Sequence, residues 1–475
     1  MQMISSRPTP SRFKPKPPQD AETPAVPPRN VVADVTATLS LSQPTAKPSS
    51  EPALTSFQQR QQRGSVLVSL NEDLELDGGD QAAKGPLSLR VIDAVSQVLR
   101  PKYMTERLAD KVAYLDSRIE EFAHELEEQN DSCAAQPLHI ASQEESVYVG
   151  RVCGDDDTSF SAAPGSVFLE GSLRHSQGHR VQLDLSHLEE YRAFPGQVLP
   201  VRGVNPTGGC LIARQLVAPK LLPRATPAST NSAGSLSVII AVGPYTTSED
   251  LSYEPLQELL KVCERLQPQS LLLLGPFVDA DHPQIADGTC EEPFDKLFTT
   301  KVLEPVREHC MDHGTQAVML PSTRDVHHEP LFPQPPFHLD GGGDVVMAPN
   351  PAMLQVGPVT VGAVTTDVLR HLSPVEAARS QRPANRMVSL ASHLVTQRSF
   401  YPLYPAAPGA VLDTSRGAHL RMACTPDILI TPSDLTSFAK PLLLQSCTPA
   451  VHSDFVREQA LGPIWCSKKC EDALY

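Results

Sequence analysis

Residues 271–279 read LLLLGPFVD, and this stretch decides the fold. Four consecutive leucines predict a strand buried on both faces, and Gly275-Pro276 predicts a sharp turn at its end. The stretches VIIAVGPY (238–245) and AVMLPSTRD (317–325) repeat this arrangement. Such strands are typical of layered α/β domains. Ligands of open α/β sheets gather beyond the carboxyl ends of the strands, so any chemistry is expected at these three turns.

Downstream of residue 235, strands and helices alternate to about residue 442. A helix is expected to begin near Pro255, and another to run from Phe294 to His313 with Gly314 as its C-cap. Further strands are predicted at 317–320, 345–348, 352–356, 359–364, 418–424 and 427–431, and a further helix at 384–397. Residues 235–442 therefore form an α/β domain.

A different pattern precedes this domain. Five short alternating runs between 146 and 217, separated by glycine-rich turns, predict a small β-barrel of the OB type. Before them, apolar residues recur at steps of three and four within 99–130 and predict an amphipathic helix. Residues 218–234 have the composition of a linker. The chain as a whole is thus α+β or α/β, with a barrel followed by a layered domain.

The N-terminal segment, residues 1–64, holds eleven prolines and two aromatic residues. It is predicted to be a disordered tail, because it cannot bury enough apolar surface to offset its ordering entropy. Thr9-Pro10 and Thr23-Pro24 could accept proline-directed phosphorylation, although such pairs are frequent in any proline-rich tail.

Charge is unevenly distributed. Residues 1–63 hold eight basic and four acidic residues, a net charge of +4. Since the whole chain has a net charge of −15, the remaining residues have a net charge of −19. A body this acidic is a poor general binder of nucleic acid, since phosphate contacts need Lys and Arg. The barrel itself has six Arg, no Lys and seven acidic residues. A protein partner is the better expectation.

Cysteines and apolar runs indicate a soluble intracellular protein. The ten cysteines form no C-x-x-C pair, and reduced thiols are the simplest interpretation. The first residues lack the apolar core of a signal peptide, and no apolar run approaches the length of a membrane span.

The three strand ends resemble those of calcineurin-like metallophosphoesterases, which carry D-x-H, G-D-x-x-D and G-N-H-D/E there. Those motifs hold two metal ions with a bridging carboxylate. In this sequence Pro276 takes the position of the bridging Asp, and Thr323 and Arg324 those of the Asn and His. Asp279 and Asp325 remain but cannot hold two metals alone. The resemblance therefore implies a phosphoesterase-like β-sandwich domain without metal, catalytic residue or cofactor.

Longer strings resemble the B-subunit family of DNA polymerase α, an accessory family with an OB fold and an inactive phosphoesterase domain. They are VGPYTTS (242–248), LGPFVDADHPQI (274–285), PSTRDVHHEPLFPQPPF (321–337), LEGSLRHS (169–176), EYRAFPGQV (190–198), TQRSFYPLYP (396–405) and TPDILITPSDL (425–435). Together they cover roughly residues 100–440.

The resemblance implies a function. It predicts a non-catalytic, nuclear, regulatory subunit of the polymerase α–primase complex that scaffolds the catalytic subunit when DNA replication begins. The expected partners are the C-terminal domain of the catalytic subunit and the primase subunits, with DNA contacted at most indirectly or weakly and no membrane. Two alternatives are a single-strand-binding OB protein and an active metallophosphoesterase.

Two departures from the family accompany the resemblance. The chain begins inside what resembles the family's flexible linker, without the small helical domain that precedes it. Residues 443–475 do not resemble the family's final strands, so the sheet is expected to lose a strand and expose an apolar edge.

Other clusters have plainer interpretations. The His327-His328 pair beside Asp325 is expected to be structural, with its polar groups bonded to backbone. His309 and His313 are expected to form an exposed pair, and the spacing of Cys466 and Cys470 is attributed to chance. The run 401–405, YPLYP, is expected to be a packed, rigid loop.

Overall fold

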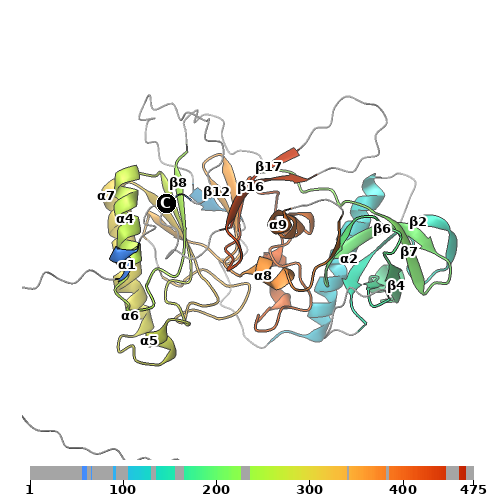
Figure 1. The fold of residues 1–475 in the computed structure, drawn as a ribbon, viewed down its shortest axis with the longest axis horizontal. Coiled ribbons are helices and arrows are strands. Elements are labelled where there is room, and N and C mark those ends of the chain that lie inside the picture. The colour runs from blue at the N-terminus through green and yellow to red at the C-terminus, as the bar shows by residue number, and fades with distance from the viewer. Residues whose placement is uncertain are drawn as a thin grey trace, which may run out of the picture. The chain divides into compact units, whose positions relative to one another are not determined.

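The structure is a computed structural model. It describes residues 56–60, 66, 89–92, 105–129, 135–155, 165–225, 236–339, 342–380, 385–444 and 459–466, with backbone alone for 441–444 and 459–466. The chain divides into two units, residues 1–54 and 55–475, and every described residue lies in the second (Figure 1).

A closed five-stranded barrel confirms the OB-type prediction for 146–217. Its strands are β2 (Ser142–Cys153), β3 (Phe168–Glu170), β4 (Arg180–Asp184), β6 (Val198–Asn205) and β7 (Cys210–Leu216), closed in the order β2-β3-β4-β7-β6. Alternating residues such as Tyr148, Leu169 and Leu211 fill its interior and are fully buried. In sequence, the short helix α3 (Leu173–Ser176) follows β3, and β5 (Tyr191–Ala193) comes between β4 and β6.

Helix α2 (Leu108–Gln129) confirms the amphipathic helix, over a shorter span than 99–130. Its second half packs Ile119, Phe122 and Leu126 on the outer face of the barrel, against Val147, Val149 and Val198. The two ends of the predicted apolar stripe differ in their exposure to solvent. Leu108, at the first turn, is 77% exposed, whereas Tyr114 in the next turns packs against the C-terminal domain.

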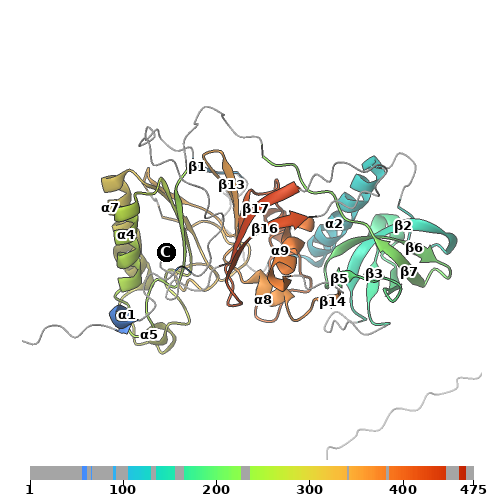
Figure 2. The same cartoon turned by 45° about the horizontal axis from the view of Figure 1, so that its top comes forward.

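The C-terminal domain contains two sheets that face each other (Figure 2). One is parallel, in the order β11-β10-β9-β8, from β8 (Val238–Val242), β9 (Ser270–Leu274), β10 (Gln316–Leu320) and β11 (Val345–Met347). The other has the order β1-β12-β13-β15-β17-β16, from β1 (Leu89–Val91), β12 (Ala352–Val356), β13 (Val359–Ala363), β15 (Ile428–Ile430), β16 (Phe438–Leu444) and β17 (Gln459–Cys466). One apolar core joins them, because Leu272 and Val318 of the first sheet contact the same cluster as Leu354 of the second.

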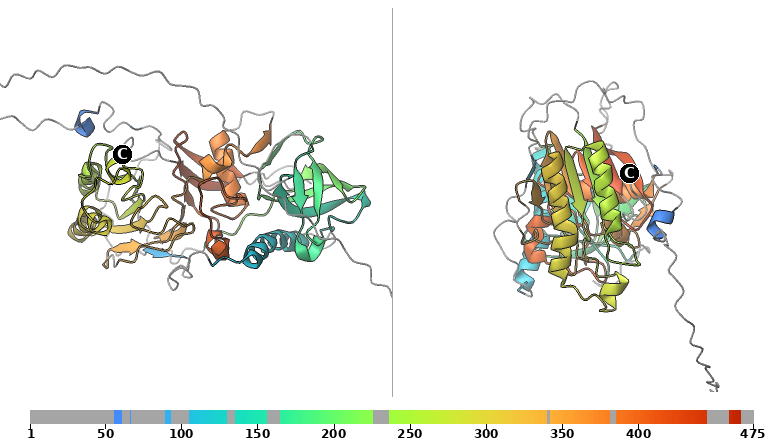
Figure 3. Two further views of the ribbon diagram at one scale, coloured as in Figure 1. Left: turned by 90° about the horizontal axis from the view of Figure 1, so that it is seen from below. Right: turned by 90° about the vertical axis from the view of Figure 1, so that its left-hand side faces the viewer.

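Helices cover the outer faces of both sheets. On the parallel sheet lie α4 (Glu254–Leu266), α6 (Phe294–Phe298), a π-helix (Thr299–Leu303) and α7 (Glu304–His313), and Figure 3 shows α4 and α7 side by side over its strands. The second sheet is covered by α8 (Val368–Leu372) and α9 (Arg386–Thr396). Helix α5 (Pro283–Ala286) follows β9. β14 (Ala377–Arg379) pairs with β5 in a separate two-stranded sheet.

The helix predicted from Phe294 to His313 is present but changes geometry in its middle. Pro305 lacks an N–H, so a regular α-helical bond to Lys301 is unavailable, and the π-helix immediately precedes α7 there. Gly314 ends the helix with φ 66°, as the C-cap prediction requires.

Two sequence predictions are wrong. Residues 414–420 form a 3-10 helix rather than the start of a strand at 418–424, because Gly417 packs under the ring of Tyr114 of α2. The tail predicted to be disordered to residue 64 contains helix α1 (Ser56–Gln59), where Phe57 is buried. The described part of the predicted linker, residues 218–225, belongs to no helix or strand, and the Thr425 hydroxyl donates to its Leu222 carbonyl at 2.6 Å.

The prediction for the end of the chain is corrected too. β17 lies parallel beside β15 and antiparallel beside β16, so residues 459–466 supply a strand to the sheet that was expected to lack one. Backbone hydrogen bonding does not depend on side-chain resemblance, which is why the sequence pattern gave no sign of this strand. The phosphorylation candidates Thr9 and Thr23, and the residues Cys470 and 1–55, lie outside the described residues.

Candidate functional site: the strand-end cavity and the barrel junction

The turns after β8 and β9 approach each other so closely that only glycine fits. A Cβ at Gly243 would lie 1.9 Å from the Pro276 carbonyl oxygen, and one at Gly275 would lie 2.5 Å from Asp325 Oδ2. Both contacts are far inside van der Waals distance. The glycines therefore let the three strand ends converge, as the sequence predicted for parallel strands.

Asp325 is the buried centre of this convergence. It is 1% exposed, and its Oδ1 accepts hydrogen bonds from the Phe277 and Val278 backbone N–H groups, the latter at 2.9 Å. Its Oδ2 accepts from the Ser322 N–H at 2.8 Å. Burial raises the pKa of Asp325 to about 7, against the opposing effect of these N–H donors. The carboxyl thus ties the second strand end to the third.

Arg324 pairs with the remaining carboxylates. Its Nη2 donates to Asp279 Oδ2, and its Nε lies 3.0 Å from Asp281 Oδ2. The Asp279 side chain is 6% exposed, so its charge would be costly without a partner. The guanidinium therefore supplies, from within the chain, positive charge beside a buried carboxylate.

All five residues predicted as the former metal site come together. Asp279 and Asp325 form an isolated antiparallel bridge, while Pro276, Thr323 and Arg324 line a cavity of about 500 Å³. We call it the strand-end cavity. Its walls come from 242–243, 275–276, 281, 322–324, 330, 332, 365–367, 370–371, 401, 408–412 and 432–434. Within the described ranges, no three His, Cys, Asp or Glu side chains are grouped so as to hold a metal ion.

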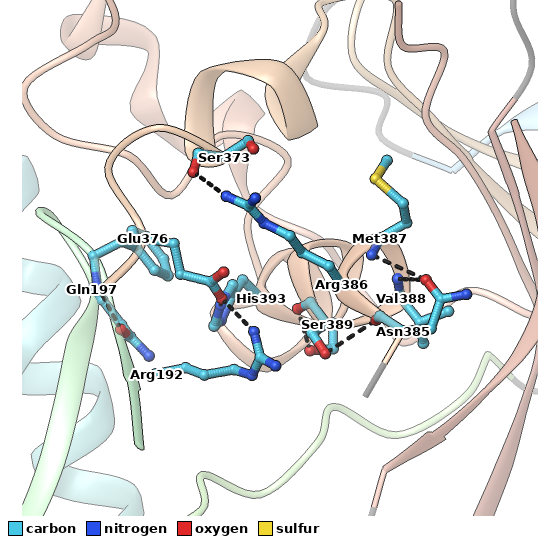
Figure 4. A network of polar contacts seen from close by, with 12 residues as sticks. Arg192, Gln197, Ser373, Glu376, Asn385, Arg386, Met387, Val388, Ser389 and His393 are labelled. Atoms are coloured by element: carbon cyan, nitrogen blue, oxygen red, sulfur yellow. Dashed lines mark hydrogen bonds and ion pairs between the residues drawn. The ribbon is translucent and has the colours of Figure 1, made fainter. Parts of the chain in front are cut away.

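A second polar cluster joins the barrel to the C-terminal domain, and we call it the barrel junction (Figure 4). Glu376 Oε1 lies 3.1 Å from Arg192 Nη1 of β5 and 2.8 Å from His393 Nε2 of α9. Burial opposes the charge of Glu376, but the bond from His393 and the proximity of Arg192 outweigh it, so its pKa lies below the ordinary value. Asn385 caps α9 by accepting from the Met387 N–H and so fixes the helix that carries His393.

Gln397 and Arg398, just after α9, complete the junction. The Gln397 amide accepts from the Val198 N–H at 2.8 Å and donates to the Val198 carbonyl at 3.0 Å, as a neighbouring strand would. Arg398 donates to Glu125 of α2 and to the Lys220 carbonyl, with its guanidinium 4.9 Å from the Phe122 ring centroid. Sequence reasoning missed this role, although 396–405 was among the strings that carried the resemblance.

Comparison with known proteins decides the family. The family model for the B subunit of DNA polymerases alpha and epsilon matches residues 238–440, and that for the OB domain of the DNA polymerase alpha B subunit matches 112–219. The DNA polymerase alpha B subunit of Mus musculus is 34% identical over 93% of this chain and 74% of its own length. The chain belongs to the B-subunit family of DNA polymerase alpha.

Other members of the family agree. The Bos taurus protein of the same name is 33% identical over 81% of this chain, and that of Schizosaccharomyces pombe is 31% identical over 79%. The chain spans about two thirds to three quarters of these relatives' lengths, from 64% to 74%. Membership makes the chain an accessory subunit in DNA replication. None of the helices described here is both long and apolar enough to cross a membrane.

The prediction that the polar groups of His327 and His328 are bonded to backbone is confirmed for only one of the two residues. His328 is bonded to backbone, with Nε2 2.8 Å from the Pro335 carbonyl oxygen. The His327 ring instead stacks on Phe298 and Phe337, and neither of its nitrogens has a hydrogen-bond partner in the described structure. Burial lowers the pKa of His327 to about 4. The sequence analysis did not predict this aromatic pocket, because one of its rings, Phe298, comes from α6 and not from the string 321–337.

Two smaller predictions can also be checked. His309 is 7% exposed and stacks on His313, which is half-buried, so the pair is not the exposed one that was predicted. The run 401–405 is a packed loop as predicted, since Tyr401 and Leu403 are each 3% exposed. Its Tyr404 N–H donates to the Pro195 carbonyl at 3.1 Å, which adds the loop to the junction.

Proposed function

We propose that this chain is a non-catalytic scaffold for the catalytic subunit of DNA polymerase α. It would bind the C-terminal domain of that subunit, within a nuclear complex that also contains primase, when replication begins. The observation that carries the proposal is the barrel junction, because buried polar contacts hold two folded β domains as one surface. Family membership supplies the identity of the polymerase.

We also propose that the C-terminal domain is a degenerate calcineurin-like phosphoesterase. Two features support this: two facing sheets with helices outside, and three strand ends that converge on Asp279 and Asp325. Metal-dependent hydrolysis would need a bridging ligand where Pro276 stands and a cation where Arg324 already pairs with Asp279. The domain would keep its shape for binding and not for catalysis.

Co-purification tests the scaffold. The full chain, tagged and expressed together with the catalytic subunit, should retain that subunit at physiological salt. Gln397→Ala should weaken retention, since it removes both contacts to Val198. Failure of the wild-type chain to retain the catalytic subunit would refute the proposed function.

A hydrolysis assay tests the loss of catalysis. The purified chain should hydrolyse neither phosphomonoesters nor phosphodiesters with Mn²⁺, Mg²⁺ or Zn²⁺ present. Turnover above background that disappears in Asp279→Ala would overturn the proposal that the domain is inactive.

A separate titration with oligonucleotides tests the barrel. Oligonucleotide binding with a steep salt dependence would favour the alternative that the barrel binds single strands.

A further inference from the structure

The strand-end cavity is large enough to hold a ligand, although the proposed loss of the metal ligands excludes metal-dependent hydrolysis there. Protein interiors leave few voids larger than a water molecule, and pockets that hold ligands or side chains measure about 300–1,000 Å³. At about 500 Å³, this cavity falls in that range. One wall is apolar, from Phe332 and residues 408–412, and another carries the hydroxyls of Ser322, Thr323, Thr365 and Thr366.

The charge of the cavity is negative. Asp281, Asp367 and Asp434 line it, and Asp279 lies directly behind Arg324. Only two guanidinium groups, those of Arg324 and Arg370, face these four carboxylates among the described lining residues. His371 does not change the balance, because burial lowers its pKa and keeps the ring neutral near pH 7. Carboxylates thus exceed cations, which favours a positively charged occupant.

Two of the carboxylates are accessible from outside. The Asp281 side chain is 74% exposed, and that of Asp434 is 50% exposed, so each can accept a further donor beside its arginine. Asp367 is engaged internally, since it accepts from the backbone N–H groups of Arg370 and Asp434. Val411, also in the lining, is 60% exposed and offers an apolar contact at the same cavity.

A buried hydroxyl gives an independent indication of a ligand. Thr366 lines the cavity and is 9% exposed, yet its Oγ1 has no hydrogen-bond partner in the described structure. Buried hydroxyls are nearly always paired. The neighbouring Thr365 hydroxyl illustrates the difference, since it donates to the Pro321 carbonyl at 2.8 Å. Thr366 therefore offers an acceptor and a donor that the fold itself does not use.

We infer that the strand-end cavity receives a lysine- or arginine-bearing segment of the polymerase catalytic subunit. The cation contacts Asp281 and Asp434 at the rim, the Thr366 hydroxyl pairs with a polar group of the segment, and an apolar neighbour contacts Val411. This inference rests on the proposed function and names the surface and chemistry by which the partner is held.

Charge reversal at the rim tests the inference. The probe is the recombinant catalytic subunit of DNA polymerase α, titrated against the full chain at several salt concentrations. Asp281→Lys combined with Asp434→Lys should weaken binding at least about tenfold and flatten its salt dependence. The matched control is Asp312→Lys with Glu291→Lys, which makes the same charge change on exposed residues outside the cavity. Equal affinity of the two double variants would overturn the inference.

Thr366→Val separates binding from folding. Because the hydroxyl has no partner within the described fold, its replacement by a methyl group should leave the melting temperature unchanged or raise it slightly. Binding should weaken about fivefold, as expected for an ordinary hydrogen bond to a polar group. Unchanged binding at an unchanged melting temperature would remove Thr366 from the site and contradict the inference.

Two further outcomes are distinguishable. If the wild-type chain fails to bind the catalytic subunit, the proposed function fails. If wild type and both double variants bind alike, the function stands and the cavity has no part in it. Inorganic phosphate is the probe for the opposite occupant: stabilisation of the chain by phosphate that Arg370→Gln abolishes would identify an anion site and overturn the inference.

Discussion

The strand-end site and the barrel junction both contain buried charged groups, but the partners of these groups lie at very different separations along the sequence. At the strand ends, Arg324 pairs with Asp279, and Asp325 accepts from N–H groups of the same two turns, those after β9 and β10. At the junction, Glu376 pairs with Arg192 and Gln397 with Val198, almost two hundred residues apart in sequence. The first set closes a site, and the second joins two domains.

The comparison teaches how the position of its partner decides what a buried charge does in the fold. A buried charge is tolerated only when it is paired. In the strand-end site the pairing partner is Arg324, so a residue of the same domain neutralises Asp279. At the junction the partners lie on separate domains, so the same rule makes the two domains depend on each other.

The largest effect is expected when the strand-end site is broken at its centre. Asp325→Ala leaves the buried N–H groups of Phe277, Val278 and Ser322 without an acceptor and should cost about 3–5 kcal/mol in the free energy of unfolding. That is a large share of a typical stability of about 5–15 kcal/mol. Urea unfolding measures it. Asp325→Asn, which keeps one acceptor oxygen, should lose less; a wild-type midpoint for Asp325→Ala would disprove the role.

The next effect concerns pH. The pKa of His327 is about 4 in the folded chain and about 6.5 when unfolded, so its effect on stability is constant above pH 6.5. As pH falls from 6.5 to 4, the unfolded chain binds the proton first, and stability decreases by a total of about 3 kcal/mol. His327→Phe keeps the stacking on Phe298 and Phe337 and should remove this part of the slope. Identical pH profiles for both chains would refute the assignment.

A smaller effect is expected at the junction. Gln397→Ala removes both bonds to Val198 and should cost about 2 kcal/mol, with faster proteolysis between the barrel and the C-terminal domain. Gln257→Ala is the matched control, because its single bond to the Ser252 carbonyl is exposed. Limited proteolysis with mass spectrometry locates the cleavage. Equal cleavage in the two variants would show that Gln397 does not hold the junction.

The smallest effect distinguishes exposed pairs from buried ones. The Arg370 and Asp434 side chains lie 2.6 Å apart but are 62% and 50% exposed. Arg370→Gln should therefore change the free energy of unfolding by less than about 1 kcal/mol. A loss comparable to that of Asp325→Ala would mean that the rim of the strand-end cavity is structural.

The sequence by itself determined most of the strand and helix positions and the convergence at 276–279 and 323–325. It could do so because buried strands and their turns are local signals: a run such as 271–274 can only be a buried segment, and Gly275-Pro276 must turn. The sequence also places Pro276, which has no side-chain ligand atom, at one of these turns. The barrel followed from five short alternating runs for the same reason.

Only the tertiary structure decided which partners the polar residues take. Nothing local to Gln397 indicates that its amide extends strand β6 at Val198, or that Arg398 reaches Glu125. The strand at 459–466 was missed because a sheet accepts any backbone that offers hydrogen bonds in register. Contacts between distant residues carry no periodic signal in the chain, so Thr366, the junction and the aromatic pocket of His327 appear only once the elements are packed.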